Sequence, residues 1–505
     1  MTKMKRSMTV MLALFMVVGL LLTGCSGKKE EPKNEASQAD ATQSNETKSN
    51  EPVTEEGSNT PTEEPVKLTW YVYSAEPKNA AAVLQKANEI IQEKINATLE
   101  FKYVNPGDYN AKMQLAMSSG EEYDIAFTAS WVNSYSENAN KGAYLALDDL
   151  LEKFPDLKGM LKEEIWDGAR INGKIYGVPN NQIMADQPGV WLKKDLVDKY
   201  QIDPGSIKSL TDFTSVFQKI KDGEPGVSAI RFGIASAFAD YYSSVVDLFA
   251  IDTKTWKVVY TPDQYTDGYK LTREWYEKGF FPQDVATLKD EASLIKAGKV
   301  FSRYSRQKPG NEAALKATNG FDVVSVVTGP AVINKGAVTS TLNAISATSK
   351  HPDKALELIN LVDTNKELFN LLKFGIEGQD YTKVSDNRIE PKPDSYAMAG
   401  WMFGNEFNSY VLPGQDDNVW DQTKVLNDSA MIDPAIGFVF DRTPVENEIA
   451  QLTAINAEYL PVLSNGLEDV DKTLSALLEK RKAAGHDKVL AEVQKQLDAW
   501  RAAQQ

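Results

Sequence analysis

The residue with the clearest chemistry in this 505-residue chain is its only cysteine, Cys25. It follows Leu22, Thr23 and Gly24 at the end of an apolar run that begins near Met8. A thiolate is a nucleophile, and the small residues before it suit a cleavage site, so Cys25 can take up a covalent group. Once Cys25 is modified, the rest of the chain has no thiol, which excludes disulfides, thiolate metal sites and a catalytic cysteine.

Other patterns of catalytic or metal-binding residues are scarce. The two histidines, His351 and His486, lie far apart in the sequence, which argues against a metal site with several histidines. Pro352 and Gly485 stand beside them, and both histidines are expected at helix starts. The chain has no Gly-x-Ser-x-Gly elbow, no His-Glu-x-x-His pair and no phosphate-binding loop. The sequence therefore predicts no metal and no cofactor.

The segment before Cys25 has the order of a signal peptide. Lys3, Lys5 and Arg6 precede the apolar run, which is too short for a membrane span with these flanks. Leu-Thr-Gly-Cys at residues 22–25 resembles the lipobox of bacterial lipoproteins. This resemblance implies a signal peptide at 1–24 and a lipid on Cys25; an ordinary secretory signal with a chance cysteine is the alternative.

The residues after Cys25 lack large apolar side chains. Residues 26–65 are rich in Glu, Ser, Thr, Asn and Pro, and such a segment cannot bury enough surface to offset its ordering. We expect 25–65 to be a lipidated cysteine followed by a disordered acidic stalk. The net charge of −16 disfavours nucleic acid and anionic lipid as partners. The body, from residue 66, is long enough for two domains.

The body begins with alternating strands and helices. Val66, Leu68, Trp70 and Val72 have the period of a strand, and apolar residues then recur at helical spacing over 83–95. A strand near 99–103, a helix over 109–119 and a buried strand over 123–127 follow. This order predicts an α/β fold with a parallel sheet. The second half is mostly helical, and Thr-Pro-Val-Glu at 443–446 predicts a helix start with a capping box.

Several segments resemble the extracellular solute-binding proteins of ABC importers, in their sugar-binding branch. The resemblance includes the opening strand from Leu68, the step into the third strand at 120–125 and the segment 142–150. Asn-Gly-Lys-Ile-Tyr-Gly-Val-Pro at 172–179 is the most specific. Asn-Gly between apolar residues predicts a two-residue hairpin turn, since both positions tolerate positive φ.

The C-terminal part resembles the LipO-like lipoproteins within that family. The similar segments are 375–378, 401–405, 437–441 and 494–500. The resemblance implies a two-lobe, type II periplasmic-binding-protein-like clamp with discontinuous lobes and a helical C-terminal region. Lobe one is expected at 66–178 with 344–395, and lobe two at 179–338 with 400–505. A ligand would bind between the lobes.

A sugar cleft needs aromatic faces for the ring and planar amides or carboxylates for the hydroxyl groups. Candidates come from strand ends, the expected crossings between the lobes, and loops. Each could equally be a packing, turn or surface residue. The candidate ligand-binding residues are Tyr73, Glu76, Trp131, Asn180, Asn181, Gln182, Arg303, Glu377, Trp401 and Asn405. Asp186, Tyr241, Tyr242 and Tyr304 are weaker candidates.

The resemblance implies a protein that captures a carbohydrate, an oligosaccharide by expectation, and delivers it to ABC permease subunits. It would be a monomer on the outer face of the cell membrane of a Gram-positive bacterium, held only by its lipid. Two alternatives remain open. A surface glycosidase needs only two paired carboxylates, and the chain has 71 acidic residues. A ligand-sensing lipoprotein that signals to a membrane partner could use the same clamp.

Overall fold

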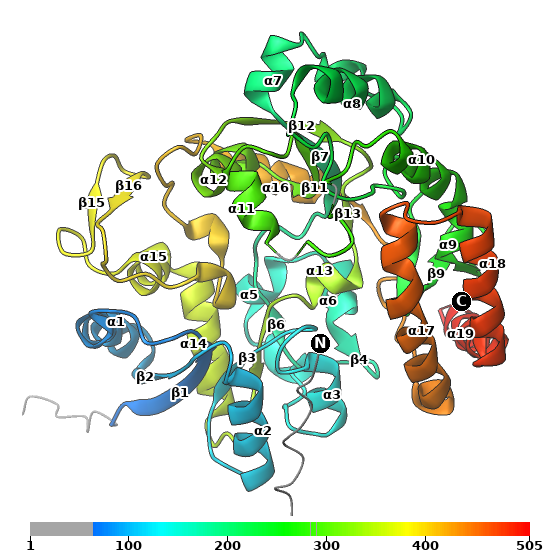
Figure 1. Cartoon of the computed structure of the whole chain (residues 1–505). Coiled ribbons are helices and arrows are strands. Elements are labelled where there is room, and N and C mark those ends of the chain that lie inside the picture. The colour runs from blue at the N-terminus through cyan, green and yellow to red at the C-terminus, as the bar shows by residue number, and fades with distance from the viewer. Residues whose placement is uncertain (1–63, 283, 289, 505) are drawn as a thin grey trace, which may run out of the picture. The chain divides into compact units, whose positions relative to one another are not determined.

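The computed structural model describes residues 64–282, 284–288 and 290–504 (Figure 1). The predicted signal peptide, Cys25 and nearly all of the predicted stalk lie outside the described residues. The body opens with β1 (Val66–Tyr73), α1 (Ala80–Ile95), β2 (Ala97–Val104), α2 (Tyr109–Ser119) and β3 (Ile125–Thr128). The helix predicted over 109–119 is confirmed residue for residue. β1 pairs in parallel with both β2 and β3, which confirms the predicted parallel opening.

Two later strands complete this first sheet. Its order is β2-β1-β3-β14-β6, with β14 (Leu342–Ile345) antiparallel to both β3 and β6 (Val178–Pro179). The chain therefore leaves the sheet after β6 and returns to it at β14. The helices that follow the return are α14 (Pro352–Thr364), which begins after His351 as predicted, and α15 (Lys366–Phe374).

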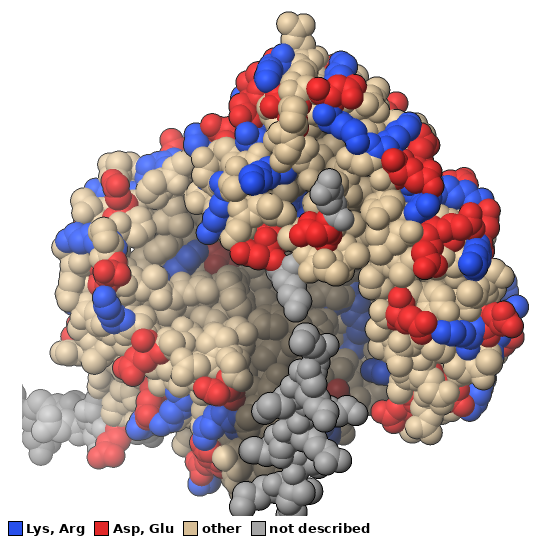
Figure 2. Space-filling view, viewed as in Figure 1, with Lys and Arg blue, Asp and Glu red and all other residues tan. Residues whose placement is uncertain are grey.

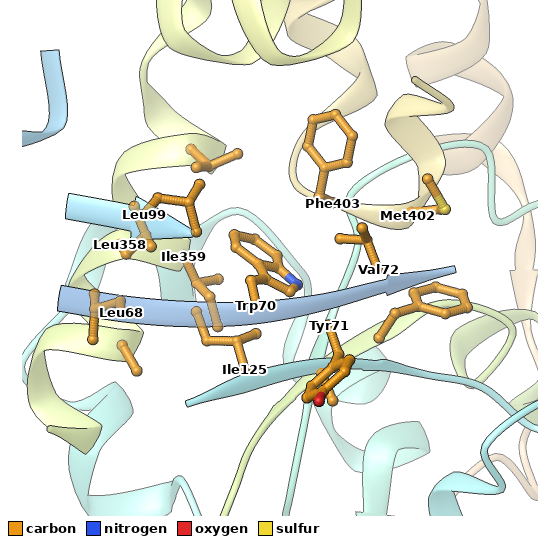
Figure 3. Close-up of a cluster of buried hydrophobic side chains, with 14 of the residues drawn as sticks. Leu68, Trp70, Tyr71, Val72, Leu99, Ile125, Leu358, Ile359, Met402 and Phe403 are labelled. Carbon is orange, nitrogen blue, oxygen red and sulfur yellow. The ribbon is translucent and has the colours of Figure 1, made fainter. Parts of the chain in front are cut away.

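Alternation along β1 builds the core of this part. Leu68, Trp70 and Val72 are fully buried on one face of the strand, while Tyr71 is buried on the other. Figure 3 shows Trp70 directed toward the side of β1 that carries Ile359, and Tyr71 directed away from it. Both faces of the strand are thus covered, as expected for a central strand of a parallel sheet.

The Asn-Gly turn forms as the sequence predicts. β4 (Arg170–Ile171) and β5 (Lys174–Ile175) pair antiparallel, and the two residues between them, Asn172 and Gly173, have φ of 50° and 80°. Positive φ at both central positions defines the turn type that matches the twist of a hairpin. The hairpin follows α6 (Glu163–Ala169). The other short helices of this region are α3 (Tyr135–Asn140), α4 (Asp148–Leu151) and α5 (Pro155–Gly159).

A second sheet lies in the part of the chain between β6 and β14. It has the order β11-β7-β12, and β7 (Gln187–Lys193) is antiparallel to both β11 (Ser302–Gln307) and β12 (Val323–Val327). A separate apolar core covers it, centred on Phe213, Phe217 and Trp275. The helices here are α7 (Lys194–Lys199), α8 (Asp212–Gly223), α10 (Thr266–Glu277), α11 (Glu291–Lys296) and α12 (Asn311–Asn319), with a 3₁₀ turn at Pro204–Ser206.

The C-terminal helices pack on a third sheet. β8 (Ser243–Val246), β9 (Phe249–Asp252) and β10 (Lys257–Tyr260) form it, and α9 (Thr261–Gln264) follows. α17 (Glu446–Ser464), α18 (Val470–Ala483) and α19 (His486–Ala502) lie beside it at the right of Figure 1. The predicted capping box at 443–446 is wrong. Thr443 lies in a 3₁₀ turn, Thr443–Val445, and α17 begins at Glu446 without a side-chain cap.

The remaining elements connect these parts. β13 (Val332–Ile333) pairs in parallel with β17 (Met431–Ile432), and β15 (Tyr381–Lys383) pairs with β16 (Ile389–Pro391). The connecting helices are α13 (Lys335–Val338), α16 (Val419–Ser429) and the 3₁₀ helices η2 (Gly400–Met402) and η3 (Glu406–Asn408).

Candidate functional site

Three aromatic side chains from distant segments meet at one edge of the first sheet. Tyr73 ends β1, Trp131 follows β3, and Trp401 lies in η2. The ring centroid of Trp131 lies 5.3 Å from that of Tyr73 and 6.2 Å from that of Trp401, and the buried Phe127 packs beneath them. This set of Tyr73, Trp131 and Trp401 is called the aromatic platform below. The carboxyl ends of parallel strands are where α/β sheets bind ligands.

Trp131 presents its ring to solvent in a fixed position. It is 51% exposed, which is unusual for so large an apolar side chain. Its Nε1 donates a hydrogen bond of 2.8 Å to the carbonyl oxygen of Ser340, just before β14. The bond fixes the edge of the indole, and the neighbouring rings support it from the side. An ordered, half-exposed indole can cover the flat apolar face of a bound ring.

Asn180 lies where the chain leaves the first sheet, and it is buried at 2% exposure. Its Oδ1 accepts hydrogen bonds from Nδ2 of Asn343, at 2.8 Å, and from the backbone N–H of Gly404, at 3.1 Å. Its Nδ2 donates to the carbonyl oxygen of Trp401 at 2.9 Å. Both acceptor positions of the amide are used, so Asn180 fastens three chain segments to one another.

The two amides after Asn180 are half-buried and face different partners. Gln182 donates from Nε2 to Oγ1 of Thr341 at 2.6 Å. The backbone oxygen of Asn181 accepts from the N–H of Glu406 at 2.8 Å, and within the described residues its side chain makes no hydrogen bond to the protein. Of the three consecutive amides, Asn181 therefore retains the most hydrogen-bonding capacity for a ligand.

Arg303 and Tyr304 lie on opposite faces of β11. In the pairing of β11 with β7, Arg303 lies opposite Trp191 and Tyr304 lies opposite Val190. Because side chains alternate along a strand, the two consecutive side chains point to different faces. Arg303 forms an ion pair with Glu291 at 2.5 Å and lies 5.6 Å from the ring centre of Phe232.

Tyr304 instead lines a cavity of about 180 Å³. Tyr241, Tyr242, Asp186 and Asn334 also line it, and this cavity is called the tyrosine pocket below. Burial raises the pKa of the Asp186 carboxyl, while Arg306, 3.1 Å away, acts in the opposite direction. The pocket offers phenol hydroxyls, one amide and one carboxylate around a small volume. Figure 2 shows that the surface is hollowed between the region of the first sheet and the C-terminal helices.

Two predicted residues lie outside both features. Glu76 is exposed, at a groove between α1 and β2. Glu377 is exposed in the turn before β15. Asn405 lies next to the Asn180 segment, because its neighbour Gly404 donates to Asn180, but its Oδ1 caps η3 by accepting from the N–H of Phe407 at 3.1 Å. The structure thus brings Tyr73, Trp131 and Trp401 together, with the Asn180 segment beside them.

The sequence predicts the residues of the tyrosine pocket only as weaker candidates, whereas the structure places them around one cavity. Tyr241, Tyr242 and Asp186 come from segments with no recognisable site motif, and they converge only through the packing of the second and third sheets. The one sequence signal for this pocket is the strand period over 302–307, because it places Arg303 and Tyr304 on opposite faces of the strand. Among the described residues, no cluster of three or more His, Cys, Asp or Glu side chains suits a metal ion. In the described chain, no helix combines the length and apolar character of a membrane span.

Comparison with known families places the chain in a class. The family of bacterial extracellular solute-binding proteins matches residues 74–367, more than half of the sequence. The chain belongs to this family, whose members bind a solute for a transporter and are not enzymes, so the glycosidase alternative is set aside. A second family, a domain of unknown function called DUF3502, matches residues 434–502, the C-terminal helices.

The chain is most usefully compared with two relatives from Streptococcus pneumoniae. A carbohydrate ABC transporter substrate-binding protein is 33% identical over 457 residues, covering 87% of this chain and 91% of the relative. The crystal structure of the N-glycan transport solute binding protein NgtS matches with a TM-score of 0.78 at 30% identity, over 87% of this chain and 100% of that one. The alginate-binding protein AlgQ2 matches with a TM-score of 0.57 at 17% identity, over 86% of this chain and 99% of that one, which indicates the fold alone.

These neighbours confirm the predicted α/β two-lobe class. The exact lobe boundaries, 66–178 with 344–395 and 179–338 with 400–505, stay a prediction, as do the individual ligand-binding residues.

Proposed function

We propose that this chain captures a neutral oligosaccharide and delivers it to the permease subunits of an ABC transporter. The aromatic platform carries the proposal, because Trp131 is half-exposed yet held in place by a hydrogen bond and by Tyr73 and Trp401. Sugar rings have an apolar face that stacks on such side chains, and their hydroxyl groups need a few placed polar partners.

The polar partners we propose are Asn181 and the tyrosine pocket. Asn181 follows Asn180 directly, and Asn180 is bonded to the carbonyl oxygen of Trp401, so Asn181 lies near the platform. In the tyrosine pocket, Asp186 and Tyr304 supply a carboxylate and a phenol. Asn180, Gln182 and Arg303 act as supports, since their side chains already have protein partners.

The ligand class we propose is taken from the sugars bound in the NgtS structures. NgtS has been crystallised with Man1GlcNAc and with Man5GlcNAc, and these structures match this chain with TM-scores of 0.66 and 0.64, against 0.78 for the first NgtS structure. The difference supports a change in lobe arrangement when that relative holds sugar. We propose mannose- and N-acetylglucosamine-containing glycans as the first ligands to test, with hinge closure around them.

We further propose that Cys25 carries a lipid and that residues 26–65 act as a flexible tether on the outer face of the cell membrane. The support is the sequence alone: the apolar run, the Leu-Thr-Gly-Cys segment and the polar composition that follows. A tether of about forty residues would allow a reach of tens of ångströms.

Isothermal titration calorimetry of the soluble body tests the ligand class. Man1GlcNAc and Man5GlcNAc should bind and raise the melting temperature, because a ligand that binds only the folded state stabilises it by mass action. An uncharged fructan and an alginate oligomer serve as controls. If only a control sugar binds, the ligand class is wrong; if the glycan is hydrolysed during the titration, the binding function itself is wrong.

A further inference from the structure

The described chain contains a larger cavity than the tyrosine pocket. Its volume is about 890 Å³, within the range of roughly 300–1,000 Å³ that is usual for small-molecule sites. The wall on one side is α6 and the β4–β5 hairpin; the wall on the other is the segment 432–439 and the end of α19. This cavity is called the C-terminal recess below. Most of its second wall belongs to the region that matches the domain of unknown function.

Two tryptophans form the aromatic part of the C-terminal recess. The ring centroids of Trp256 and Trp500 lie 6.2 Å apart, and Phe438 supports Trp500 at 5.8 Å. Both indoles are half-buried. Gln494 of α19 fixes the turn that carries Trp256: it accepts from the N–H of Val258 at 2.8 Å and donates to the carbonyl oxygen of Trp256 at 3.2 Å. The pair is therefore an ordered aromatic surface and not a loose contact.

The polar groups of the C-terminal recess have nearly balanced charge. Arg170 lines the opposite wall, but Asp148 and Asp167 hold its guanidinium at 2.7 and 2.9 Å. Arg501 lies 4.5 Å from the ring centre of Trp256. Asn172, at the hairpin turn, is exposed; its Nδ2 donates to Oδ1 of Asn140 at 2.8 Å, which leaves its Oδ1 for a ligand hydroxyl. Three acidic and two basic side chains line the recess, so its net charge is small, and with an amide and indole faces it suits a neutral, hydroxyl-rich ligand better than a strongly charged one.

One hydrogen-bonded pair separates the C-terminal recess from the tyrosine pocket. Asp433 lines the recess and accepts hydrogen bonds from the hydroxyl of Tyr241 at 3.0 Å and from Oγ of Ser243 at 2.5 Å. Tyr241 lines the tyrosine pocket. The two cavities therefore lie on either side of one hydrogen-bonded pair, in which Asp433 is buried.

We infer that the C-terminal recess is an accessory subsite for the outer rings of a long or branched neutral oligosaccharide. This inference rests on the proposed function, because the inner rings are placed at the aromatic platform and the tyrosine pocket. On this inference, the C-terminal helices take part in ligand binding, because α19 supplies an aromatic wall that short sugars do not reach. Selectivity for glycan length would then come from Trp500 and Asn172, and ring stacking itself from Trp131.

Calorimetry with Man1GlcNAc and Man5GlcNAc tests the inference on the wild-type protein and three variants. Trp500→Ala should weaken the binding of Man5GlcNAc about tenfold and leave the affinity for Man1GlcNAc unchanged, because only the larger glycan reaches the recess. Trp500→Phe keeps an aromatic contact with Phe438 and should lose less affinity for Man5GlcNAc than Trp500→Ala does. Asn172→Gly preserves the positive φ of the turn and should also weaken only Man5GlcNAc.

Each outcome decides the question. Equal losses for both glycans, or no loss for either, would overturn the accessory subsite while leaving the proposed function intact. Failure of the wild-type protein to bind either glycan or any other neutral oligosaccharide would overturn the proposed function and the subsite together. If Trp500→Ala does not fold, as judged by its thermal transition, Asn172→Gly carries the test, since the residue is exposed at a hairpin turn.

Discussion

The indole rings of Trp131 and Trp401 lie 6.2 Å apart with their planes inclined by 56°, although one follows β3 and the other lies in η2, far along the chain. Phe127 contacts both rings from below, at centroid distances of 6.1 and 5.6 Å. The η2 segment thus contributes part of the aromatic surface at the edge of the first sheet.

Trp131→Ala should weaken glycan binding by about 10- to 100-fold, since it removes the exposed ring of the aromatic platform. The melting temperature should change little because the side chain is 51% exposed. Calorimetry and thermal unfolding measure the two effects. Leu115→Ala is a matched control, because Leu115 is an exposed apolar residue on α2. Unchanged affinity in Trp131→Ala would place the sugar elsewhere.

Asn180→Ala should lower the free energy of unfolding by roughly 2–4 kcal/mol, because it leaves buried groups of Asn343 and Gly404 without partners. Urea denaturation measures this. Asn181→Ala is the control: Asn181 bonds to the protein through its backbone oxygen, and that bond survives the substitution. The expected contrast is a loss of stability at position 180 and a loss of affinity at position 181. The reverse pattern would contradict the roles assigned to the two amides.

His486 should make the protein less stable in mild acid. Burial lowers its pKa to about 4, and the nearby guanidinium of Arg481 acts in the same direction. The unfolded chain then binds a proton below pH 6.5 that the folded chain does not bind. Stability therefore falls as pH decreases from 6.5 to 4, by at most about 3 kcal/mol from this residue.

Denaturation of the wild type and of His486→Phe at pH 7, 6, 5 and 4.5 checks this effect. The variant should lose less stability over this range, since it has nothing to protonate at this position. His351→Asn, at the start of α14, is the control and should follow the wild type. Parallel curves for the wild type and His486→Phe would contradict the burial argument.

Lys335 should give a dependence of the same sign at alkaline pH, with stability rising as pH increases. Burial lowers its pKa to about 8, and its Nζ donates to the carbonyl oxygen of Gly168 at 3.1 Å. Between pH 8 and 10.5 the unfolded chain holds a proton that the folded chain has lost, so stability rises with pH. The gain from pH 8 to 9.5 should be about 1–2 kcal/mol. Lys335→Met should abolish this rise in denaturation measured at pH 7.5, 8.5 and 9.5, and a persistent rise would exclude Lys335 as its source.

Cys25→Ala should release the protein from membranes and leave glycan affinity unchanged, because the proposed tether makes no contribution to the site. Membrane fractionation and calorimetry measure the two properties. Retention of the variant in the membrane fraction would contradict the lipid anchor. A loss of affinity would mean that the segment before residue 66 takes part in binding.

Local patterns gave correct predictions where the physical cause is local. Asn172 and Gly173 form the expected turn because they tolerate positive φ, whatever surrounds them. The strand over 66–73 and the helix over 109–119 follow from side-chain period alone. The helix predicted to start at 443–446 does begin at Glu446, but its capping box does not form, because the backbone before it is a 3₁₀ turn in which Asp441 accepts from the N–H of Thr443.

The candidate site was only partly accessible from sequence. Strand ends pointed to Tyr73 and Trp131, since ligands bind at the carboxyl edge of parallel sheets. Asn180 has the same side chain as Asn181, yet it is buried among backbone groups of other segments and its neighbour is not. Arg303 and Tyr304 differ by one position along a strand, and that single step sends them to opposite faces of the sheet.

The sequence by itself determined the family, the parallel opening, the Asn172–Gly173 hairpin turn and the single thiol at Cys25, because each depends on residue type and spacing within a short stretch. Only the tertiary structure decided that Trp131 meets Trp401, that Asn180 faces inward, and that Trp256 meets Trp500 in the C-terminal recess. These contacts join segments that are distant in the chain. Their formation depends on how the separate cores pack, and no local period or motif encodes that packing.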